Sequence, residues 1–331
     1  MSGGGARTGV VAIGRNEGER LKMCLASLRG TVSPLVYVDS GSTDGSVQYA
    51  KDQGCDVVEL DRSTPFTMAR ARNTGFHRLM EIAPETESVQ FVDGDCEIED
   101  GWIEDAVRTM ASRQDVGAIC GHRREGFREA SMFNRLIDMD WAGPVGEVDL
   151  CGGDVLMRVD AFRQVKGYRD QMIAGEDPEI CVRLRQCGWK LMRLDRMMTV
   201  HDADMTRLSQ WWRRSLRTGH SFAEQAALHG KPPYRHCVRE TRSNWFGGLI
   251  LPLIVLALAW PTGGWSLLLL LAYPIWIVRI AGGQIRRGHD RKDAWLYAVF
   301  CTLGKFPQMT GQLWYWMNRL RSRRTALIEY K

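Results

Sequence analysis

The first 240 residues of this 331-residue chain lack a long apolar run, and several other common features are missing as well. Residues 1–7 have no apolar core of the kind that signal peptides carry, so we expect this part to stay in the cytosol. The nine cysteines show neither paired zinc spacing nor the density of a disulfide scaffold, which indicates a reducing compartment. There is no internal repeat and no long low-complexity tract. The length therefore suits one large domain with an appendage.

Short β-type runs alternate with helical patterns in the first sixty residues. Residues 10–13, 35–38 and 57–60 have the composition of strands, and residues 21–28 have helical spacing. This alternation predicts βαβ units and a mainly parallel sheet with helices on its faces. In open sheets of this kind, ligands bind beyond the carboxyl ends of the strands. Residues that directly follow strands are therefore the first candidates for a site.

Polar side chains follow the first two expected strands. Arg15 and Glu17 come after the first strand, and Asp39 ends the second. A carboxylate at that point can accept a hydrogen bond from a nucleobase N–H or a ribose hydroxyl. It can equally serve a turn, in which Ser42 or Asp44 caps the next helix. Both interpretations of Asp39 stay open at this point.

Asp93, Gly94 and Asp95 follow the apolar run of residues 89–92. Two carboxylates this close repel each other unless a positive charge lies between them. A hard divalent cation such as Mn²⁺ or Mg²⁺ takes oxygen ligands and in turn holds the phosphates of a nucleotide. Asp-Gly is also an ordinary turn dipeptide, so the motif alone is weak. Its position at a strand end favours a metal site.

Arg70 and Arg72 stand at the start of an expected helix that contains Phe76 and Leu79. Arginines at a helix start oppose the helix macrodipole. They are favourable there if an anion binds, because a diphosphate suits both guanidinium groups and N-terminal amides. The alternative is that both are solvated surface arginines.

In this order, the segments around Arg15, Asp39, Arg72 and Asp93 resemble the nucleotide-binding half of family 2 glycosyltransferases, which have the GT-A fold. The resemblance covers residues 9–201 and implies an inverting enzyme that uses a nucleoside diphosphate sugar and a divalent metal. It implies donor contacts from Arg15, Glu17, Asp39, Arg72, Asp93, Gly94 and Arg213, metal ligands Asp95, Asp93 and His201, acceptor-side residues Gly152, Gly153 and Asp154, and a catalytic base at Asp177. Ser40 departs from an acidic residue common in the family. Residues 210–214 match the signature of processive synthases only loosely, which favours transfer of a single sugar.

Asp177 is also a candidate base on physical grounds. Pro178 suits the first position of a helix, and Ile180 and Leu184 form an apolar pair behind it, so Asp177 is expected to be the N-cap. The second carboxylate oxygen of a cap stays free to take a proton from an attacking hydroxyl. Glu176 could share this role, and its charge would raise the pKa of its neighbour.

His201 follows the β-like run of residues 191–200. A histidine at a strand end is often a hydrogen-bonded surface residue, and it is also a common metal ligand. The family resemblance favours the second interpretation, because GT-A enzymes often complete the metal site with a late histidine.

Residues 207–242 contain eight Lys or Arg and only two acids, interleaved with Trp211, Trp212 and Phe222. Such a segment suits either nucleic acid or an anionic lipid surface. The next segment favours lipid, because residues 245–260 and 265–278 form two apolar blocks around the turn at 261–264. Each block is slightly short for the roughly 20 residues of a membrane span. A tilted span, a re-entrant hairpin and a buried soluble hairpin are all compatible with that length.

Basic residues flank both apolar blocks, which by the positive-inside rule places both flanks in the cytoplasm. We therefore expect a catalytic domain on the cytoplasmic face of the cell membrane and no nucleic-acid partner. Residues 294–317, which contain Lys305 and Pro307, are expected to form an interfacial helix or a helix pair.

The sequence thus predicts a GT-A catalytic domain at residues 1–205, with nucleotide-sugar binding at 8–100 and the acceptor side at 101–205. A basic interfacial region follows at 206–243, a transmembrane or re-entrant hairpin at 244–283, and interfacial helices with a basic tail at 284–331. The expected reaction moves one sugar to a hydroxyl of a lipid-linked or membrane-proximal glycan. Alternatives are a polyprenyl-phosphate sugar synthase, a sugar-phosphate nucleotidyltransferase and a noncatalytic membrane scaffold.

Overall fold

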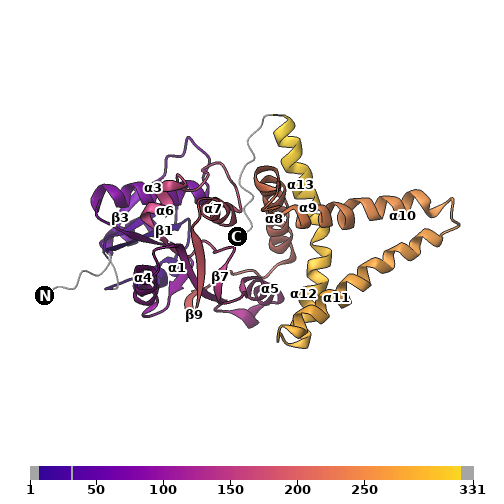
Figure 1. The fold of residues 1–331 in the computed structure, drawn as a ribbon, viewed down its shortest axis with the longest axis horizontal. Helices are drawn as coiled ribbons and strands as arrows, with labels where there is room; N and C mark the ends of the chain where they lie inside the picture. Colours follow the sequence, from indigo (N-terminus) through magenta and orange to yellow (C-terminus); the bar gives the residue numbers. More distant parts are fainter. Residues whose placement is uncertain (1–6, 31–32, 322–331) are drawn as a thin grey trace. The chain divides into compact units, whose positions relative to one another are not determined.

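The computed structural model describes residues 7–30 and 33–321, and their contacts divide the chain into two units. Unit 1 takes its residues from 1–126 and 141–203, and unit 2 from 127–140 and 204–331. Figure 1 shows strands and their covering helices in the first unit, and helices alone in the second.

Unit 1 is built on one mixed sheet with strand order β3-β2-β1-β4-β8-β6-β9-β5, and β7 pairs with β9. The strands are β1 (Thr8–Gly14), β2 (Leu35–Asp39), β3 (Asp56–Glu59), β4 (Ser88–Asp93), β5 (Cys96–Ile98), β6 (Val116–Glu125), β7 (Gly146–Val148), β8 (Val155–Arg158) and β9 (Lys190–His201). The sheet is parallel from β3 to β4, as the βαβ pattern predicts. Beyond β4 it is mixed rather than mainly parallel, because β8 runs antiparallel to both β4 and β6.

Helices cover the sheet and fill the core of unit 1. They are α1 (Glu19–Ser27), α2 (Ser46–Asp52), α3 (Met68–Ile82), α4 (Trp102–Ser112), α6 (Val159–Gln164) and α7 (Glu176–Gln186). Helix α3 lies close to the sheet, because a Cβ on Gly75 would come within 2.3 Å of Val11 Cγ1. Phe76 packs on Phe162 with ring centroids 4.3 Å apart. Buried aromatic contacts of this kind fix the height of α3, and hence of its arginines, over the sheet.

Strand register brings the expected site residues to one edge of the sheet. Gly14 pairs with Asp39, and Ile13 pairs with Asp93, so the carboxyl ends of β1, β2 and β4 lie side by side. The loops after β1 and β2 are also joined, because the Asn16 N–H donates to Ser42 Oγ at 2.9 Å. The prediction that these strand ends share one edge is confirmed.

Unit 2 is helical. Its elements are η1 (Arg128–Ala130), α5 (Met132–Trp141, whose last residue belongs to unit 1), α8 (Leu208–His229), α9 (Val238–Trp245), the π-helical turn η2 (Phe246–Ile250), α10 (Leu251–Ala259), η3 (Trp265–Leu271), α11 (Ala272–Arg286), α12 (Arg291–Leu303) and α13 (Lys305–Leu320). Helices α8 and α13 cross at glycines. A Cβ on Gly219 would lie 1.9 Å from the Gln308 carbonyl, and one on Gly311 would lie 2.0 Å from the Leu216 carbonyl. Only glycine permits backbones to approach this closely. Residues 294–317 thus fall within two helices, the pair expected from the sequence.

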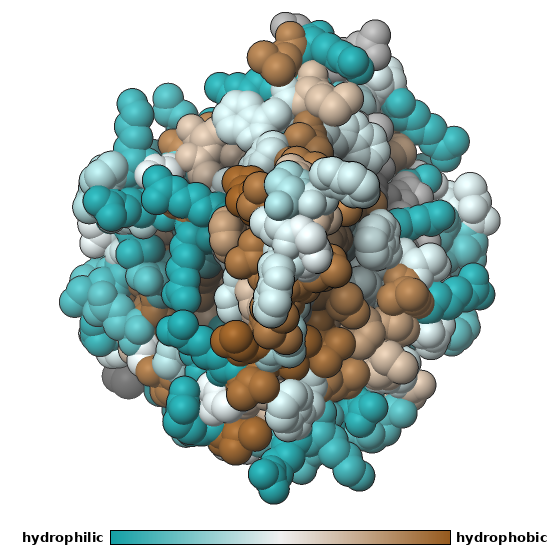
Figure 2. All heavy atoms as spheres, turned by 90° about the vertical axis from the view of Figure 1, so that its right-hand side faces the viewer, coloured by the Kyte–Doolittle hydropathy of each residue, from teal (hydrophilic) through white to brown (hydrophobic). Residues whose placement is uncertain are grey.

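Two continuous helical segments of unit 2 are long and apolar enough to cross a membrane by length and composition. They are Val238–Ala259, which joins α9, η2 and α10, and Trp265–Arg286, which joins η3 and α11. Each has 22 residues, so both are longer than the apolar blocks from which they were predicted. Only 28% and 11% of their most apolar windows are buried. Leu256 is 71% exposed, Trp260 94% and Trp265 74%. In Figure 2, hydrophobic side chains gather through the middle of the face that is shown.

Candidate active site

The Asp93-Gly94-Asp95 segment makes a tight turn between β4 and β5. The Gly94 N–H donates to the Ile13 carbonyl at 2.7 Å, and a Cβ on Gly94 would lie 3.0 Å from the same oxygen. A side chain there would press on backbone, so the turn favours glycine. The turn leaves Asp93 at the end of β4 and Asp95 just before β5. The Asp93-Gly94-Asp95 segment is thus a turn that also places two carboxylates close together.

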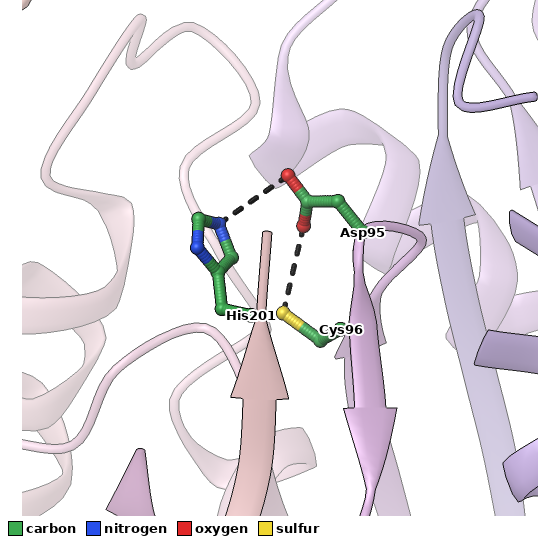
Figure 3. A group of neighbouring side chains, drawn as sticks. All are labelled: Asp95, Cys96 and His201. Atoms are coloured by element: carbon green, nitrogen blue, oxygen red, sulfur yellow. Dashed lines mark hydrogen bonds and ion pairs between the residues drawn. The ribbon is translucent and has the colours of Figure 1, made fainter. Parts of the chain in front are cut away.

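Asp95 faces His201, the last residue of β9. Strands β5 and β9 pair with Cys96 opposite His201, and the His201 Nε2 atom lies 3.3 Å from Asp95 Oδ2. Figure 3 shows the imidazole next to one carboxylate oxygen of Asp95 and the Cys96 thiol next to the other. The Cys96 thiol donates to Asp95 Oδ1 at 3.5 Å. Ligand atoms of these three residues lie within 4.8 Å of one another, close enough to share one ion.

The donor set favours a hard divalent ion. Carboxylate oxygen and imidazole nitrogen are ligands that Mn²⁺ accepts, whereas thiolate selects softer metals. Burial raises the pKa of the Cys96 thiol well above its usual range, although Arg123 opposes the shift. The thiol therefore keeps its proton and offers Asp95 a hydrogen bond. A second group, formed by Asp93, Cys96 and Asp154, lies equally close together.

Arg72 lies at the centre of three carboxylates and is 1% exposed. Its Nη2 donates to Asp93 Oδ1 at 2.7 Å, and its Nη1 donates to Glu176 Oε1 at 2.9 Å and Asp177 Oδ1 at 3.1 Å. The alternative of a solvated surface arginine is therefore wrong for Arg72. Arg70 instead holds the preceding loop through the carbonyls of Asp61 and Thr64. A diphosphate contact from Arg72 stays a prediction.

Asp177 lies at the second position of α7 rather than at its N-cap. The helix begins at Glu176, and Gly175, with a φ of 79°, is the cap. Gly175 adopts this left-handed conformation without strain, which lets the helix start earlier than Pro178 suggested. Pro178 is then the third helical residue, where its missing N–H is still not needed. The prediction that Asp177 caps the helix is wrong.

The pKa of Asp177 is raised to about 8. Burial is the main cause and Arg72 opposes it, while the negative charges of Glu176 and Asp93 raise the pKa further. The side chain is still 20% exposed, so water reaches one edge of it and moderates the effect of burial. A carboxyl group with a pKa near neutrality can accept a proton and release it again, as a general base must.

The acceptor-side residues surround the same cluster. A Cβ on Gly153 would lie 2.2 Å from Arg72 Nη2 and 3.2 Å from Asp177 Oδ2, so this position favours glycine. A Cβ on Gly152 would meet no atom within 4 Å. Asp154, 1% exposed, accepts from the Asp93 N–H at 2.9 Å and from the Thr199 hydroxyl at 3.0 Å. Asp154 thus ties β4 to β9 beneath the site.

Arg123 is a site residue that sequence reasoning missed. Its guanidinium lies 3.5 Å from Asp154 Oδ2, 3.9 Å from Asp93 Oδ2 and 4.5 Å from the Trp141 ring centroid. Burial lowers the pKa of Arg123, but these carboxylates outweigh it and raise the pKa above its usual range. The sequence pattern that could have found Arg123 is the two-residue period of a strand, which puts Arg123 and Glu125 on the same face of β6.

The remaining donor candidates differ in their surroundings. Asp39 is 1% exposed, and its Oδ2 accepts from the N–H groups of Gly41 and Ser42 at 2.8 and 2.7 Å, so it serves turn chemistry here. Arg15 is exposed, with its guanidinium 5.6 Å from the Phe66 ring centroid. Glu17 pairs with Arg20 at 3.1 Å. Arg213 is exposed on α8 of unit 2. Their roles in binding a donor stay predictions.

The fold defines the class of protein. The mannosyltransferase PcManGT from Pyrobaculum calidifontis, solved with GDP-Man and Mn²⁺, is similar over 93% of this chain and 87% of its own, with a TM-score of 0.62 and 19% identity. Glucosyl-3-phosphoglycerate synthase from Mycobacterium tuberculosis, solved with Mn²⁺, UDP and glucosyl-3-phosphoglycerate, is similar over 69% and 81%, with a TM-score of 0.50 and 14% identity. The first unit therefore has the GT-A glycosyltransferase fold.

Residues 10–165 match the family described as Glycosyl transferase family 2, so the chain carries a domain of that family. It is a glycosyltransferase that acts on nucleotide sugars. The succinoglycan biosynthesis protein ExoA of Rhizobium meliloti is 23% identical over 79% of this chain and 83% of its own length. The pre-mycofactocin glycosyltransferase of Mycobacterium tuberculosis is 29% identical over 65% of this chain, which spans 46% of that longer relative.

Proposed function

We propose that this protein is a membrane-attached, metal-dependent, inverting glycosyltransferase that moves one sugar to a hydroxyl of a lipid-linked or membrane-proximal glycan. The observation that carries the proposal is the juxtaposition of Asp95 with His201, beside the Arg72 cluster that holds Asp177. The first pair supplies ligands for Mn²⁺ or Mg²⁺. Such an ion, when bound, stabilises the charge on a departing nucleoside diphosphate.

Asp177 is the proposed base. In an inverting transfer, one carboxylate removes the proton of the acceptor hydroxyl as the oxygen attacks the anomeric carbon from the face opposite the leaving group. The carboxylate Oδ1 is held by Arg72 Nη1 at 3.1 Å. Arg72 thereby fixes the orientation of the base, and the buried Glu176 shares the same Nη1 atom. No covalent enzyme intermediate is required.

The acceptor class rests on unit 2. The exposed apolar hairpin, formed by the helices at Val238–Ala259 and Trp265–Arg286, suits a lipid bilayer better than water. A catalytic domain attached in this way works on substrates held at the membrane surface. ExoA, by its name, acts in succinoglycan biosynthesis, which is consistent with a glycan acceptor.

A donor screen on the purified, detergent-solubilised chain tests the proposal. UDP- and GDP-sugars are supplied with Mn²⁺ and a membrane lipid extract, and both released nucleoside diphosphate and sugar in the lipid fraction are measured. We expect equal amounts of the two products with one donor. Pyrophosphate release in a parallel reaction supplied with a nucleoside triphosphate and a sugar 1-phosphate would indicate nucleotidyl transfer. Sugar attached directly to a polyprenyl phosphate would indicate the synthase alternative. No turnover of any donor would favour the scaffold.

A further inference from the structure

Glu125, the last residue of β6, contacts the imidazole of His201 on the side away from Asp95. Strands β6 and β9 run parallel with Glu125 opposite His201, and the next strand residues in register are Arg124 and Val200. The Glu125 Oε2 atom lies 3.2 Å from His201 Nδ1. His201 therefore has one carboxylate at each ring nitrogen, Glu125 at Nδ1 and Asp95 at Nε2.

Glu125 is an acidic residue in a fully buried position. Its side chain is 0% exposed, and a buried carboxylate is costly unless hydrogen-bond donors satisfy it. One donor is His201, the last residue of β9, and the other lies two residues further along the chain. The Ala203 N–H lies 3.1 Å from Oε2, and the His201 ring nitrogen is the second donor. Glu125 is thus held from two sides.

The position of Glu125 suits a His201 ring that binds an ion at Nε2. An ionised carboxylate only accepts hydrogen bonds, so when an ion takes the place of a proton at Nε2, the N–H that remains on Nδ1 donates to Glu125. The Nε2 atom faces Asp95 at 3.3 Å, so the two residues can share that ion. Trp141 contacts the imidazole edge-on with ring centroids 4.7 Å apart, which restricts rotation of the ring. Glu125 and Trp141 therefore hold the ring with Nε2 directed at the proposed ion position.

We propose that Glu125 is a positioning residue for the metal site: it holds His201 in the Nδ1–H tautomer with the Nε2 lone pair directed to the ion shared with Asp95. The inference rests on the proposed metal-dependent function and adds a residue that acts on the ion only through His201. A carboxylate behind a ligating histidine typically changes metal affinity by about 10–100-fold.

A matched control lies on the same two strands. His122 on β6 pairs with Asp195 on β9, with Nε2 and Oδ1 3.0 Å apart. This pair is an exposed histidine–carboxylate contact, because the Asp195 side chain is 84% exposed. Asp195→Asn therefore makes the same chemical change, on the neighbouring strand, at a place with no proposed ion.

The test compares Mn²⁺ binding by the wild type, Glu125→Gln and Asp195→Asn, measured by electron paramagnetic resonance of free Mn²⁺ on the full chain in detergent. We expect Glu125→Gln to bind Mn²⁺ about 10–100-fold more weakly and Asp195→Asn to bind like the wild type. In the metal-free protein, ¹⁵N spectra should show a strong hydrogen bond from the His201 Nδ1–H in the wild type and a weaker one in Glu125→Gln.

The outcomes separate this inference from the proposed function. Equal Mn²⁺ affinity in the wild type and a folded Glu125→Gln would overturn the role of Glu125 and leave the metal site intact. Absence of Mn²⁺ binding by the wild type would overturn both. If Glu125→Gln does not fold, Glu125→Asp carries the test: its shorter carboxylate should weaken Mn²⁺ binding, and unchanged affinity would contradict the inference.

Discussion

The two units differ in the kind of side chain that each places in an unfavourable environment. Unit 1 buries charge: Arg72, Glu125, Asp154 and Glu176 are each at most 3% exposed. Unit 2 does the opposite and exposes large apolar side chains, Trp260 and Trp265 among them. Buried charge and extended exposed apolar surface are both costly in water. We therefore propose a different ligand for each unit: a cation with its anionic substrate for unit 1, and lipid for unit 2.

The charged side chains at the site of unit 1 do not balance one another. Asp93, Asp154, Glu176 and Asp177 lie around the guanidinium groups of Arg72 and Arg123, and Asp95 lies beside His201. When all five carboxyl groups are ionised, negative charges outnumber positive ones. A divalent cation offsets much of that excess, and a proton on Asp177 offsets part of it when the cation is absent.

Asp177→Asn should have the largest effect. The amide keeps the size of the side chain but cannot accept a proton, so turnover should fall by about 10²–10⁴-fold, with little change in donor affinity. Steady-state kinetics with the donor found by the screen measure both quantities. Asp52→Asn, an exposed carboxylate at the end of α2, is the matched control and should be fully active. Near-normal turnover of Asp177→Asn would exclude the base assignment.

Arg72→Gln should destabilise unit 1 strongly. The change leaves three carboxylates without their shared guanidinium, and breaking a buried ionic cluster costs about 3–5 kcal/mol of unfolding free energy. The loss should be largest above neutral pH and shrink in acid: without Arg72 the folded-state pKa values rise, and protonation then removes the repulsion. Denaturant unfolding in detergent measures it. Arg78→Gln, which breaks a half-exposed pair with Asp56, should change stability much less. A similar result for both variants would contradict the account.

Leu256→Asp tests the apolar side of the comparison. A charged residue within a membrane helix costs about 2.5–3.5 kcal/mol, so partition into phosphatidylglycerol vesicles should fall roughly 100-fold. Leu208→Asp, also an exposed leucine but on α8 outside the hairpin, serves as the control. Vesicle flotation reports the bound fraction. Unchanged flotation of Leu256→Asp would argue against insertion of the hairpin.

Glu176→Gln should shift the pH dependence by a smaller amount. Asp177 must lose its proton to act as a base, so kcat/KM rises with pH through its pKa, which is about 8 before the metal binds. Glu176 raises that pKa through its negative charge. Its neutralisation should move the acidic limb to lower pH by up to about one unit. A shift to higher pH would contradict this electrostatic arrangement.

Several residues of the site could be predicted from sequence because they stand at the ends of strands. Asp93, Asp95 and His201 each stand where an apolar run stops, and the sheet brings those ends together. The partners of Arg72 could not be read in this way, because Glu176 is 104 residues away on another helix. Glu125 carried no motif, and its role depends on the pairing of β6 with β9. Local patterns predict elements, whereas pairings between distant segments depend on the finished sheet.

We propose that the buried charge of unit 1 forms a cation-dependent site for transfer of the sugar from a nucleoside diphosphate sugar. Sugar transfer by the wild type and by Asp95→Ala, each assayed with Mn²⁺ and with a chelator, tests this proposal. The account predicts transfer only by the wild type with Mn²⁺. Equal transfer by the chelated wild type, or by Asp95→Ala, would contradict it.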